Sequence, residues 1–346
     1  MSEPQPPNLR RRILLRDVAE AAKVSKSTAS RALADDPRIS QATRLAVQVK
    51  AAELQYVPNV AARSLRRRHT STLGLLIPNL NDPVHGQIAS GFEEVASQAG
   101  FCVMMVAGED HPATERVALK VFAEHGADAV AVVSSAISPR EARERVDPAR
   151  LVLVQPDHRS LPRRDGPVLP GVILTDDAAG VRAAVEHLVD CGYRRIAYVE
   201  GEGGAANAVR SAAATAALRD RGVRAGLRII PASEEAWRAP DALADAIRAD
   251  PPDALVCYDD KLALALMDAL RQRGTRVPDQ LGIVGFDGIP YTAISNPRLT
   301  TVSTPTGEMG RLAAASLIRA IRDGTPPEGR RLAPELVVRE STRPQA

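Results

Sequence analysis

The stretch from Leu15 to Leu33, LRDVAEAAKVSKSTASRAL, constrains the fold more than any other part of the chain. Its apolar residues recur at helical spacing on both sides of a short break, which predicts two helices joined by a tight turn. The facing apolar residues are Val18, Ala19 and Ala22 on the first helix and Val24, Ala29 and Leu33 on the second. Ser25 stands directly before the second helix and can cap its first turn through the side-chain oxygen.

The second predicted helix carries a narrow polar face. Its polar residues stand at positions i, i+1, i+4 and i+5 and are Lys26, Ser27, Ser30 and Arg31. A short helix with a basic, hydroxyl-bearing face fits the major groove of DNA when a partner helix holds it in place. A small helical hairpin with a solvated polar edge has the same periodicity, so the helix pair alone leaves both interpretations open.

Charge is unevenly distributed along the chain. Residues 1–70 hold fourteen Lys and Arg against six Asp and Glu, a net charge of +8, whereas the whole chain carries +3 and the remainder therefore −5. A basic first part followed by a mildly acidic second part is typical of a nucleic-acid-binding protein whose second part has a separate role.

The residues after the helix pair extend the predicted head. Ser40 can cap a third helix over residues 41–55, and Pro58 would stop it. The apolar residues expected to close a three-helix core on it are Ala42, Leu45, Val49, Ala52 and Leu54. A fourth helix over residues 60–66 is so short that we expect it to form only against DNA or a second copy of itself. Residues 1–12 are expected to be a disordered basic arm.

From residue 72 onward, apolar strand-like runs alternate with helical patterns. Nearly all-apolar strands separated by helices predict parallel sheets covered on both faces, and this rhythm occurs twice. The predicted fold class is α/β, with an all-α helix-turn-helix head followed by a two-lobed body of doubly wound parallel sheets. The predicted parts are the arm (1–12), the helix-turn-helix domain (13–58), the short helix and linker (59–71), a first lobe (72–156 and 302–325) and a second lobe (157–301 and 326–346).

Polar residues follow several predicted strands, where ligands bind in sheets of this kind. In the first lobe they fall in residues 81–85, 109–110 and 155–158, and in the second lobe they are Asn207, Arg210, Asp259 and Asp287. Each could instead cap or flank a helix. A cation near the start of a helix opposes the helix dipole, so Arg210 indicates an anionic or polyhydroxyl partner.

Sequence motifs recur along nearly the whole chain. They are DVAEAAKVSKSTASRAL, YVPNVAARSLR, TLGLLIPNLNDP, EHLVDCGYRRIAYVEG, YDDKLALALMDALRQRG, VPDQLGIVGFDGIP, LTTVSTPTGEMGRLAA and LVVREST. Together they resemble the LacI/GalR family of transcription regulators. The resemblance implies a body similar to periplasmic sugar-binding proteins and a homodimeric regulator, usually a repressor, on a near-palindromic operator.

The resemblance also implies which residues contact DNA. Lys26, Ser27 and Arg31 match positions that meet base edges, and Thr28 and Ser30 match phosphate or groove contacts. Residues 59–66 resemble the hinge helix, which enters the minor groove in pairs. The matched hinge residues are Asn59, Ala62 where two hinges touch, Arg63, Leu65 as the wedge between bases, and Arg66.

For the body, the resemblance implies a small-molecule effector between the lobes, a sugar or similar polar metabolite. The matched positions are Val84, His85, Gln155, Arg210, Asp259 and Asp287. The strand ends add Asp110 and Asn207, and Trp237 could be a stacking wall or a core or surface residue.

Three departures from the family pattern bear on these expectations. Lys23 stands where the family usually has Gly, Val84 and His85 replace a Phe pair, and Asp259 replaces Asn. More acidic and fewer aromatic groups favour a polyhydroxylated or cationic ligand over a purine.

Other classes of function fit the sequence less well. A solute-binding transport protein would need an export signal and no basic head, and the Gly-rich residues 201–204 lack the full GxGxxG spacing of a dinucleotide site. Cys102, Cys191 and Cys257 show no metal spacing, and no catalytic constellation stands out. We therefore expect a cytoplasmic regulator without metal, cofactor, enzymatic activity or membrane partner.

Overall fold

The computed structural model describes residues 13–57, 69–109, 111–134, 136–156, 167–201 and 204–343. The chain divides into two compact units, Met1–Thr70 and Ser71–Ala346, which are called the head and the body below. The predicted arm, the hinge residues 59–66 and Asp110 lie outside the described residues.

The head contains the predicted helix pair and third helix. These are α1 (Leu15–Ala21), α2 (Lys26–Ala32) and α3 (Gln41–Glu53). Both predicted caps are confirmed, because the side-chain oxygen of Ser25 accepts a hydrogen bond from the Thr28 amide and that of Ser40 accepts one from the Thr43 amide.

The buried face of α3 differs from the predicted one. Val47 and Ala51 are buried and Leu54 packs beside them, whereas the side chains of Leu45 and Val49 are 62% and 47% exposed. The predicted residues Ala42 and Ala52 are also exposed. Both apolar stripes have helical spacing, so periodicity alone could not select the one that contacts α1 and α2. Only Leu54 of the predicted α3 core residues is confirmed.

The turn between α1 and α2 holds Lys23 at a φ of 51°. The amide of Val24 donates to the carbonyl of Ala19 and that of Lys23 to Glu20, an ending that normally uses Gly at this position. A side chain in this conformation costs roughly 1 kcal/mol. We therefore expect Lys23→Gly to raise the free energy of unfolding of the head by roughly 0.5–1 kcal/mol in urea denaturation. Lys23→Ala retains the Cβ atom and should give no such gain; equal stabilisation by both variants would contradict the explanation.

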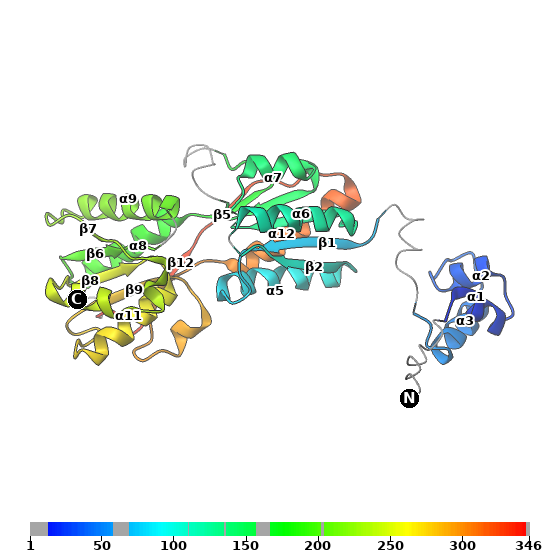
Figure 1. The fold of residues 1–346 in the computed structure, drawn as a ribbon, viewed down its shortest axis with the longest axis horizontal. Coiled ribbons are helices and arrows are strands. Elements are labelled where there is room, and N and C mark those ends of the chain that lie inside the picture. The colour runs from blue at the N-terminus through cyan, green and yellow to red at the C-terminus, as the bar shows by residue number, and fades with distance from the viewer. Residues whose placement is uncertain are drawn as a thin grey trace, which may run out of the picture. The chain divides into compact units, whose positions relative to one another are not determined.

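The body contains two six-stranded sheets (Figure 1). The first has the order β11-β5-β4-β3-β1-β2 and the second β12-β10-β9-β8-β6-β7. The described pairings are parallel except that of β10 with β12. This is the doubly wound arrangement that the sequence predicts, once in each lobe.

The strands of the first sheet are β1 (Thr72–Ile77), β2 (Cys102–Ala107), β3 (Ala129–Val133), β4 (Leu151–Val154), β5 (Val172–Thr175) and β11 (Arg330–Leu332). Its helices are α5 (Pro83–Gln98), α6 (Pro112–Glu124), α7 (Pro139–Arg145), the 3-10 turn Pro148–Arg150 and α12 (Thr306–Asp323).

The strands of the second sheet are β6 (Ile196–Val199), β7 (Arg228–Ile230), β8 (Ala254–Cys257), β9 (Gly282–Asp287), β10 (Thr300–Ser303) and β12 (Glu335–Val337). Its helices are α8 (Asp177–Asp190), α9 (Gly204–Asp220), α10 (Asp241–Ala249), α11 (Asp260–Gln272) and the 3-10 turns Glu234–Trp237 and Pro290–Ala293.

The sheet pairing corrects the predicted lobe boundaries. β5 pairs with β4 and with β11, so residues 172–175 and 330–332 belong to the first sheet rather than to the second lobe. β10 pairs with β9, so residues 302–303 belong to the second sheet rather than to the first lobe. The prediction placed the change of lobe at the Pro-rich loop after β4, whereas the chain crosses after β5, after β10 and between β11 and β12.

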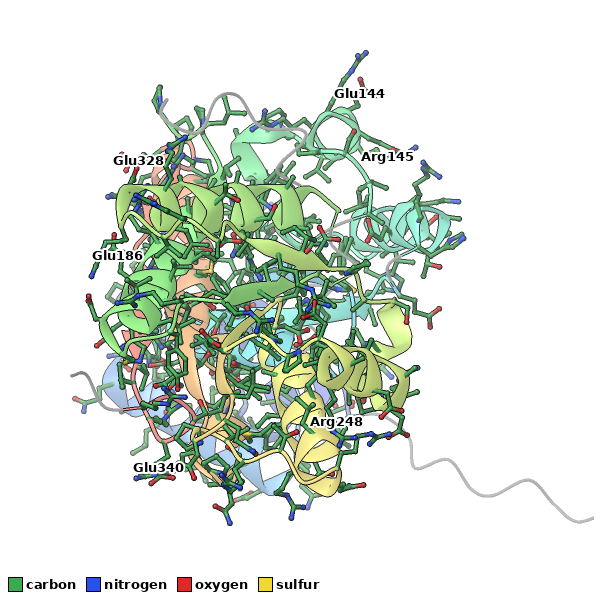
Figure 2. The ribbon with its side chains drawn as sticks, turned by 90° about the vertical axis from the view of Figure 1, so that its left-hand side faces the viewer. Glu144, Arg145, Glu186, Arg248, Glu328 and Glu340 are labelled. Atoms are coloured by element: carbon green, nitrogen blue, oxygen red, sulfur yellow. The ribbon has the colours of Figure 1, made fainter. Side chains whose placement is uncertain are left out.

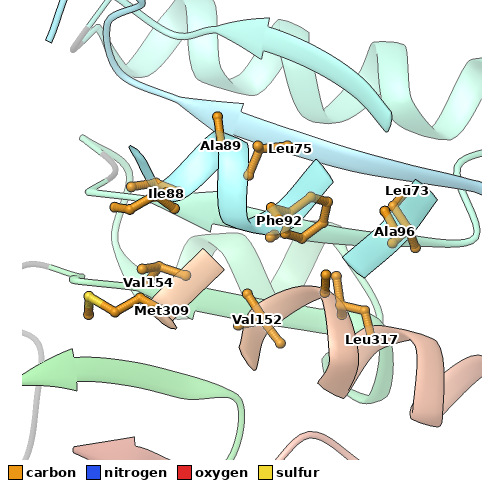
Figure 3. Packing of buried hydrophobic residues seen from close by; sticks show 14 of the residues in the cluster. Leu73, Leu75, Ile88, Ala89, Phe92, Ala96, Val152, Val154, Met309 and Leu317 are labelled. Atoms are coloured by element: carbon orange, nitrogen blue, oxygen red, sulfur yellow. The ribbon is translucent and has the colours of Figure 1, made fainter. Parts of the chain in front are cut away.

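In the first lobe, α5 and α12 lie together on one face of the sheet. Figure 3 shows Phe92 of α5 against the strands and Met309 and Leu317 of α12 near Val152 and Val154. The two helices approach so closely that a Cβ atom at Gly310 would overlap the carbonyl oxygen of Ile88.

Polar side chains occupy the outer faces of the covering helices. Glu144 and Arg145 of α7 and Glu186 of α8 point away from the ribbon in Figure 2. Within the described residues, no helix is both long and apolar enough to cross a membrane.

Candidate nucleic-acid interface and interlobe ligand site

The head presents the predicted polar face on α2. Lys26, Ser27 and Arg31 are exposed, while Ala29 and Ala32 on the opposite side are fully buried. The Ser25 hydroxyl lies 2.8 Å from both the Ser27 and the Thr28 hydroxyl oxygens, which ties the start of the helix together. Thr28 and Ser30 are half-buried at its edge. The helix therefore offers two cations and hydroxyl groups on one accessible side.

In the body, strained backbone is found at the carboxyl ends of several strands. Glu109, Ser134, Gln155 and Asp287 have φ values of 56°, 40°, 50° and 104°. Residues other than Gly rarely adopt positive φ, and where they do, the strain often belongs to a functional site. Glu109, Gln155 and Asp287 stand at strand ends that the sequence predicts for ligand binding, whereas Ser134 follows β3, where no site residue was predicted.

Arg210 of α9 lies in a buried ion pair. Its Nε donates to Asp177 Oδ2 at 2.9 Å, and its Nη1 donates to the Tyr258 carbonyl oxygen at 2.5 Å. The guanidinium carbon lies 3.7 Å from the centre of the Phe286 ring. Burial alone would lower the pKa of Arg210, but the acidic groups around it, Asp177 foremost among them, together outweigh burial and raise the pKa. The anionic partner that the sequence indicated for Arg210 is thus, in this structure, a carboxylate of the chain itself.

A chain of hydrogen bonds extends this ion pair into the first lobe. Thr175 Oγ1 donates to Asp177 Oδ1 at 2.6 Å, and Gln155 Nε2 donates to Thr175 Oγ1 at 2.8 Å. Gln155 lies at the end of β4 and Thr175 at the end of β5, where the chain leaves the first sheet. Two predicted effector residues, Gln155 and Arg210, are therefore linked through two residues that the prediction did not name.

Three carboxylates, Asp259, Asp260 and Asp287, gather at the ends of β8 and β9, and Asp259 and Asp287 interact with the charge of Arg210. Burial raises the pKa of Asp259 despite its hydrogen bond from the Leu262 amide, and it raises the pKa of Asp287 despite the charge of Arg210. Burial also raises the pKa of Asp260 to about 7, although Thr301 Oγ1 and the Ile289 amide donate to it. These carboxylates exceed the cations available to neutralise them, which favours hydrogen-bond donors or positive charge in a ligand.

Lys261 of α11 is the second cation of this region. Its Nζ donates to Asp82 Oδ2 at 2.5 Å and lies 3.7 Å from Asp259 Oδ2. The same Nζ lies 5.7 Å from the centre of the Trp237 ring, whose side chain is 39% exposed. Asp82, Arg210, Asp259, Lys261 and Asp287 are called the interlobe cluster below.

The remaining predicted residues lie close to this cluster or support it. Val84 and His85 are in the first turn of α5, and His85 Nδ1 lies 3.1 Å from the Asn79 carbonyl oxygen. Asn207 is buried, and its Oδ1 accepts hydrogen bonds from Tyr198 Oη and the Gly201 amide. Asn207 therefore connects the first turns of α9 to Tyr198 and Gly201.

Asp177 and Lys261 were not among the predicted site residues. Asp177 comes two residues after β5, a strand end at which no site residue was predicted. Lys261 comes directly after two carboxylates that follow β8, of which only the first, Asp259, was predicted. Among the described residues, no group of three His, Cys, Asp or Glu side chains is placed to hold a metal ion.

Comparisons with known proteins match both units. Residues 14–59 match the model for bacterial regulatory proteins of the lacI family, and residues 185–342 match that for a periplasmic binding protein-like domain. The HTH-type transcriptional regulator DegA of Bacillus subtilis (strain 168) is 31% identical over 341 residues, covering 95% of this chain and 97% of DegA.

Two solved structures have a similar fold. The Lac repressor dimer bound to operator and the anti-inducer ONPF has a TM-score of 0.84 at 22% identity, covering 96% of this chain and all of that one. The transcriptional regulator CelR in complex with cellobiose has a TM-score of 0.65 at 27% identity, covering 95% of this chain and all of CelR. With the helix-turn-helix head and the two doubly wound lobes, these findings show that the chain belongs to the LacI family of bacterial regulatory proteins.

Proposed function

We propose that this protein is a homodimeric transcriptional repressor that binds a near-palindromic operator and responds to a small polar metabolite. The observation that carries the proposal is the combination, in one chain, of the exposed basic face of α2 with paired lobes whose strand ends hold the interlobe cluster. DegA is named a transcriptional regulator, and the Lac repressor was solved as a dimer on its operator. From this role on DNA we infer that the protein acts in the cytoplasm.

For the head, we propose that Lys26, Ser27 and Arg31 contact base edges and that Thr28 and Ser30 contact phosphates or the groove wall. Asn59, Ala62, Arg63, Leu65 and Arg66 are proposed as the hinge contacts. Selection from a pool of random duplexes with the full-length protein tests sequence-specific binding directly.

Arg31→Ala is expected to weaken binding to the selected duplex by about 5- to 150-fold and to relax preference at particular base pairs. Competition binding against single-base variants of that duplex measures both effects. Arg38→Ala removes the same charge from the head, at a side chain that pairs with Asp36 outside α2. Equal loss on every duplex from both substitutions would contradict the assignment of Arg31 to base contact.

For the effector, we propose a sugar or related polyhydroxylated or cationic molecule. Asp259 and Asp287 supply acceptors for ligand hydroxyl or ammonium groups, and Trp237 supplies a ring for the apolar face of a sugar. In the described residues, Arg210 Nη2 has no hydrogen-bond partner and can donate to a ligand. Val84, His85, Asp110, Gln155 and Asn207 complete the proposed site. CelR was solved with cellobiose, which supports the same class of ligand.

Two other functions have weaker support. A solute-binding transport protein would account for the lobes but leaves the head without a role. An enzyme would need a set of reacting groups, and the interlobe cluster contains carboxylates paired with cations but no nucleophile beside a base. We therefore propose a binding protein without catalytic activity. Substrate turnover by the purified protein would overturn that proposal.

A further inference from the structure

Asp82 and Lys261 come from different lobes and meet directly. Asp82 follows β1, and its Oδ1 accepts a hydrogen bond from the Val84 amide at 2.9 Å, which caps α5. Its other oxygen, Oδ2, accepts from Lys261 Nζ at 2.5 Å. Lys261 is in the first turn of α11, which packs on the second sheet, whereas α5 belongs to the first lobe (Figure 1). The Asp82 carboxylate therefore both caps a helix of the first lobe and contacts the second lobe.

The ion pair is partly shielded from solvent. The side chains of Lys261 and Asp82 are 29% and 16% exposed. Burial alone would raise the pKa of Asp82, but the hydrogen bond and charge of Lys261 outweigh it and lower the pKa. Burial alone would lower the pKa of Lys261, and Asp82 and Asp259 reverse that shift. An ion pair in such surroundings is worth more than one on the open surface.

The two helices that carry this pair belong to separate hydrophobic cores. Ile88, Ala89 and Phe92 of α5 are buried in the first lobe, while Leu262 and Ala263 of α11 are buried in the second. Neither helix helps to bury the other, so the cores do not determine the separation between the start of α5 and the start of α11. A direct polar contact between the first turns of these two helices can determine their separation.

We propose that the Asp82–Lys261 ion pair holds the two lobes closed before an effector binds, and that Asp82 and Lys261 are positioning residues for the effector site. The inference rests on the proposed function, because it concerns the regulation of the same site. Without the pair, the loops after β1 and β8 separate, and the effector-free protein shifts to a more open population. Operator binding, which depends on the arrangement of the lobes, then changes without any effector.

The chain contains a built-in reporter of this contact. Trp237 is its only tryptophan, and Lys261 Nζ lies beside its ring. Acrylamide quenching of Trp237 fluorescence in the full-length, effector-free protein therefore measures how accessible the region around Lys261 is. Asp82→Asn is the cleanest variant, because Asn retains the cap oxygen for α5 and loses only the charge.

The experiment compares Asp82→Asn, Lys261→Gln and the double variant with the unsubstituted protein. We expect the quenching constant to rise about twofold in Asp82→Asn, and the double variant to match Lys261→Gln. Affinity for the selected duplex should shift about fivefold or more, by the same factor in all three variants. Glu141→Gln is the matched control, since it breaks a 2.6 Å ion pair with Arg116 inside the first lobe. It should change neither quantity.

Several results would overturn the proposal. These are an unchanged quenching constant in Asp82→Asn, additive effects in the double variant, or the same changes in Glu141→Gln. Asp82→Ser, which also keeps a cap oxygen, replaces Asp82→Asn if the latter has a lowered melting temperature. If the unsubstituted protein selects no duplex, the proposed function fails, and the quenching comparison still decides whether the ion pair holds the lobes closed.

Discussion

Gly310→Ala is expected to lower the free energy of unfolding of the body by about 2–4 kcal/mol, because α12 has no room for a methyl group where it crosses α5. A Cβ atom at Gly310 would overlap the Ile88 carbonyl oxygen and lie 2.8 Å from the Phe92 amide nitrogen. Both are backbone atoms of α5, so no side chain can rotate away. The helices must move apart, and the core around Phe92 and Met309 opens with them. Denaturant unfolding followed by circular dichroism measures the loss.

Gly86→Ala is the matched control for this prediction. Gly86 lies in α5, the helix that α12 crosses, and a Cβ atom there would meet nothing within 4 Å. Ala is the better helix former, so this substitution should stabilise the body by roughly 0.5–1 kcal/mol. If Gly310→Ala were as well tolerated as Gly86→Ala, the result would contradict the explanation that α5 and α12 pack too closely for a methyl group at position 310.

Arg210→Met is expected to lower the free energy of unfolding by about 3–5 kcal/mol in the absence of any effector. The Met side chain retains an apolar contact with Phe286 but leaves the Asp177 carboxylate without its cation. The Asp177 side chain is only 2% exposed, and a carboxylate buried to that extent is costly once its cation is removed. The same denaturant measurement reports the change.

The double variant Arg210→Met/Asp177→Asn should recover part of the lost free energy of unfolding, because it also removes the buried negative charge of Asp177. Arg182→Ala is the matched control: Arg182 pairs with Asp220 at 2.9 Å between α8 and α9, with both side chains about half-exposed, and its loss should cost under about 1 kcal/mol. If the double variant were no more stable than Arg210→Met, the charge of Asp177 would not be the cause of the destabilisation. If this prediction holds, an Arg210 variant that no longer binds effector must also be tested for folding, because the loss of binding could result from unfolding.

The sequence predicted those features that depend on short-range patterns. The third helix of the head was predicted over residues 41–55 and is found at Gln41–Glu53, because a cap signal at Ser40 precedes it and Pro58 follows it. Ser25 was predicted as a cap from the same kind of signal. The doubly wound lobes followed from the repeated alternation of apolar strands with helices.

The features that the sequence did not predict depend on pairing over long distances. Whether β5 extends the first sheet or begins the second depends on its pairing with β4. The sequence around β5 would have the same pattern of apolar residues in either arrangement. The choice between the two apolar stripes of α3 depends on where α1 and α2 lie. The partners of Arg210 and Lys261 are 33 and 179 residues away in the chain, and no local rule relates them.

The three crossings of the chain between the lobes have a consequence for biosynthesis. The part of the first lobe that leaves the ribosome early lacks α12 and β11, which come from residues 306–332 near the end of the chain. Until α12 arrives, the nascent protein displays the apolar sides of α5, β3 and β4 that α12 later covers. The lobe translated first is thus completed last, and for most of translation the growing polypeptide needs protection from aggregation there.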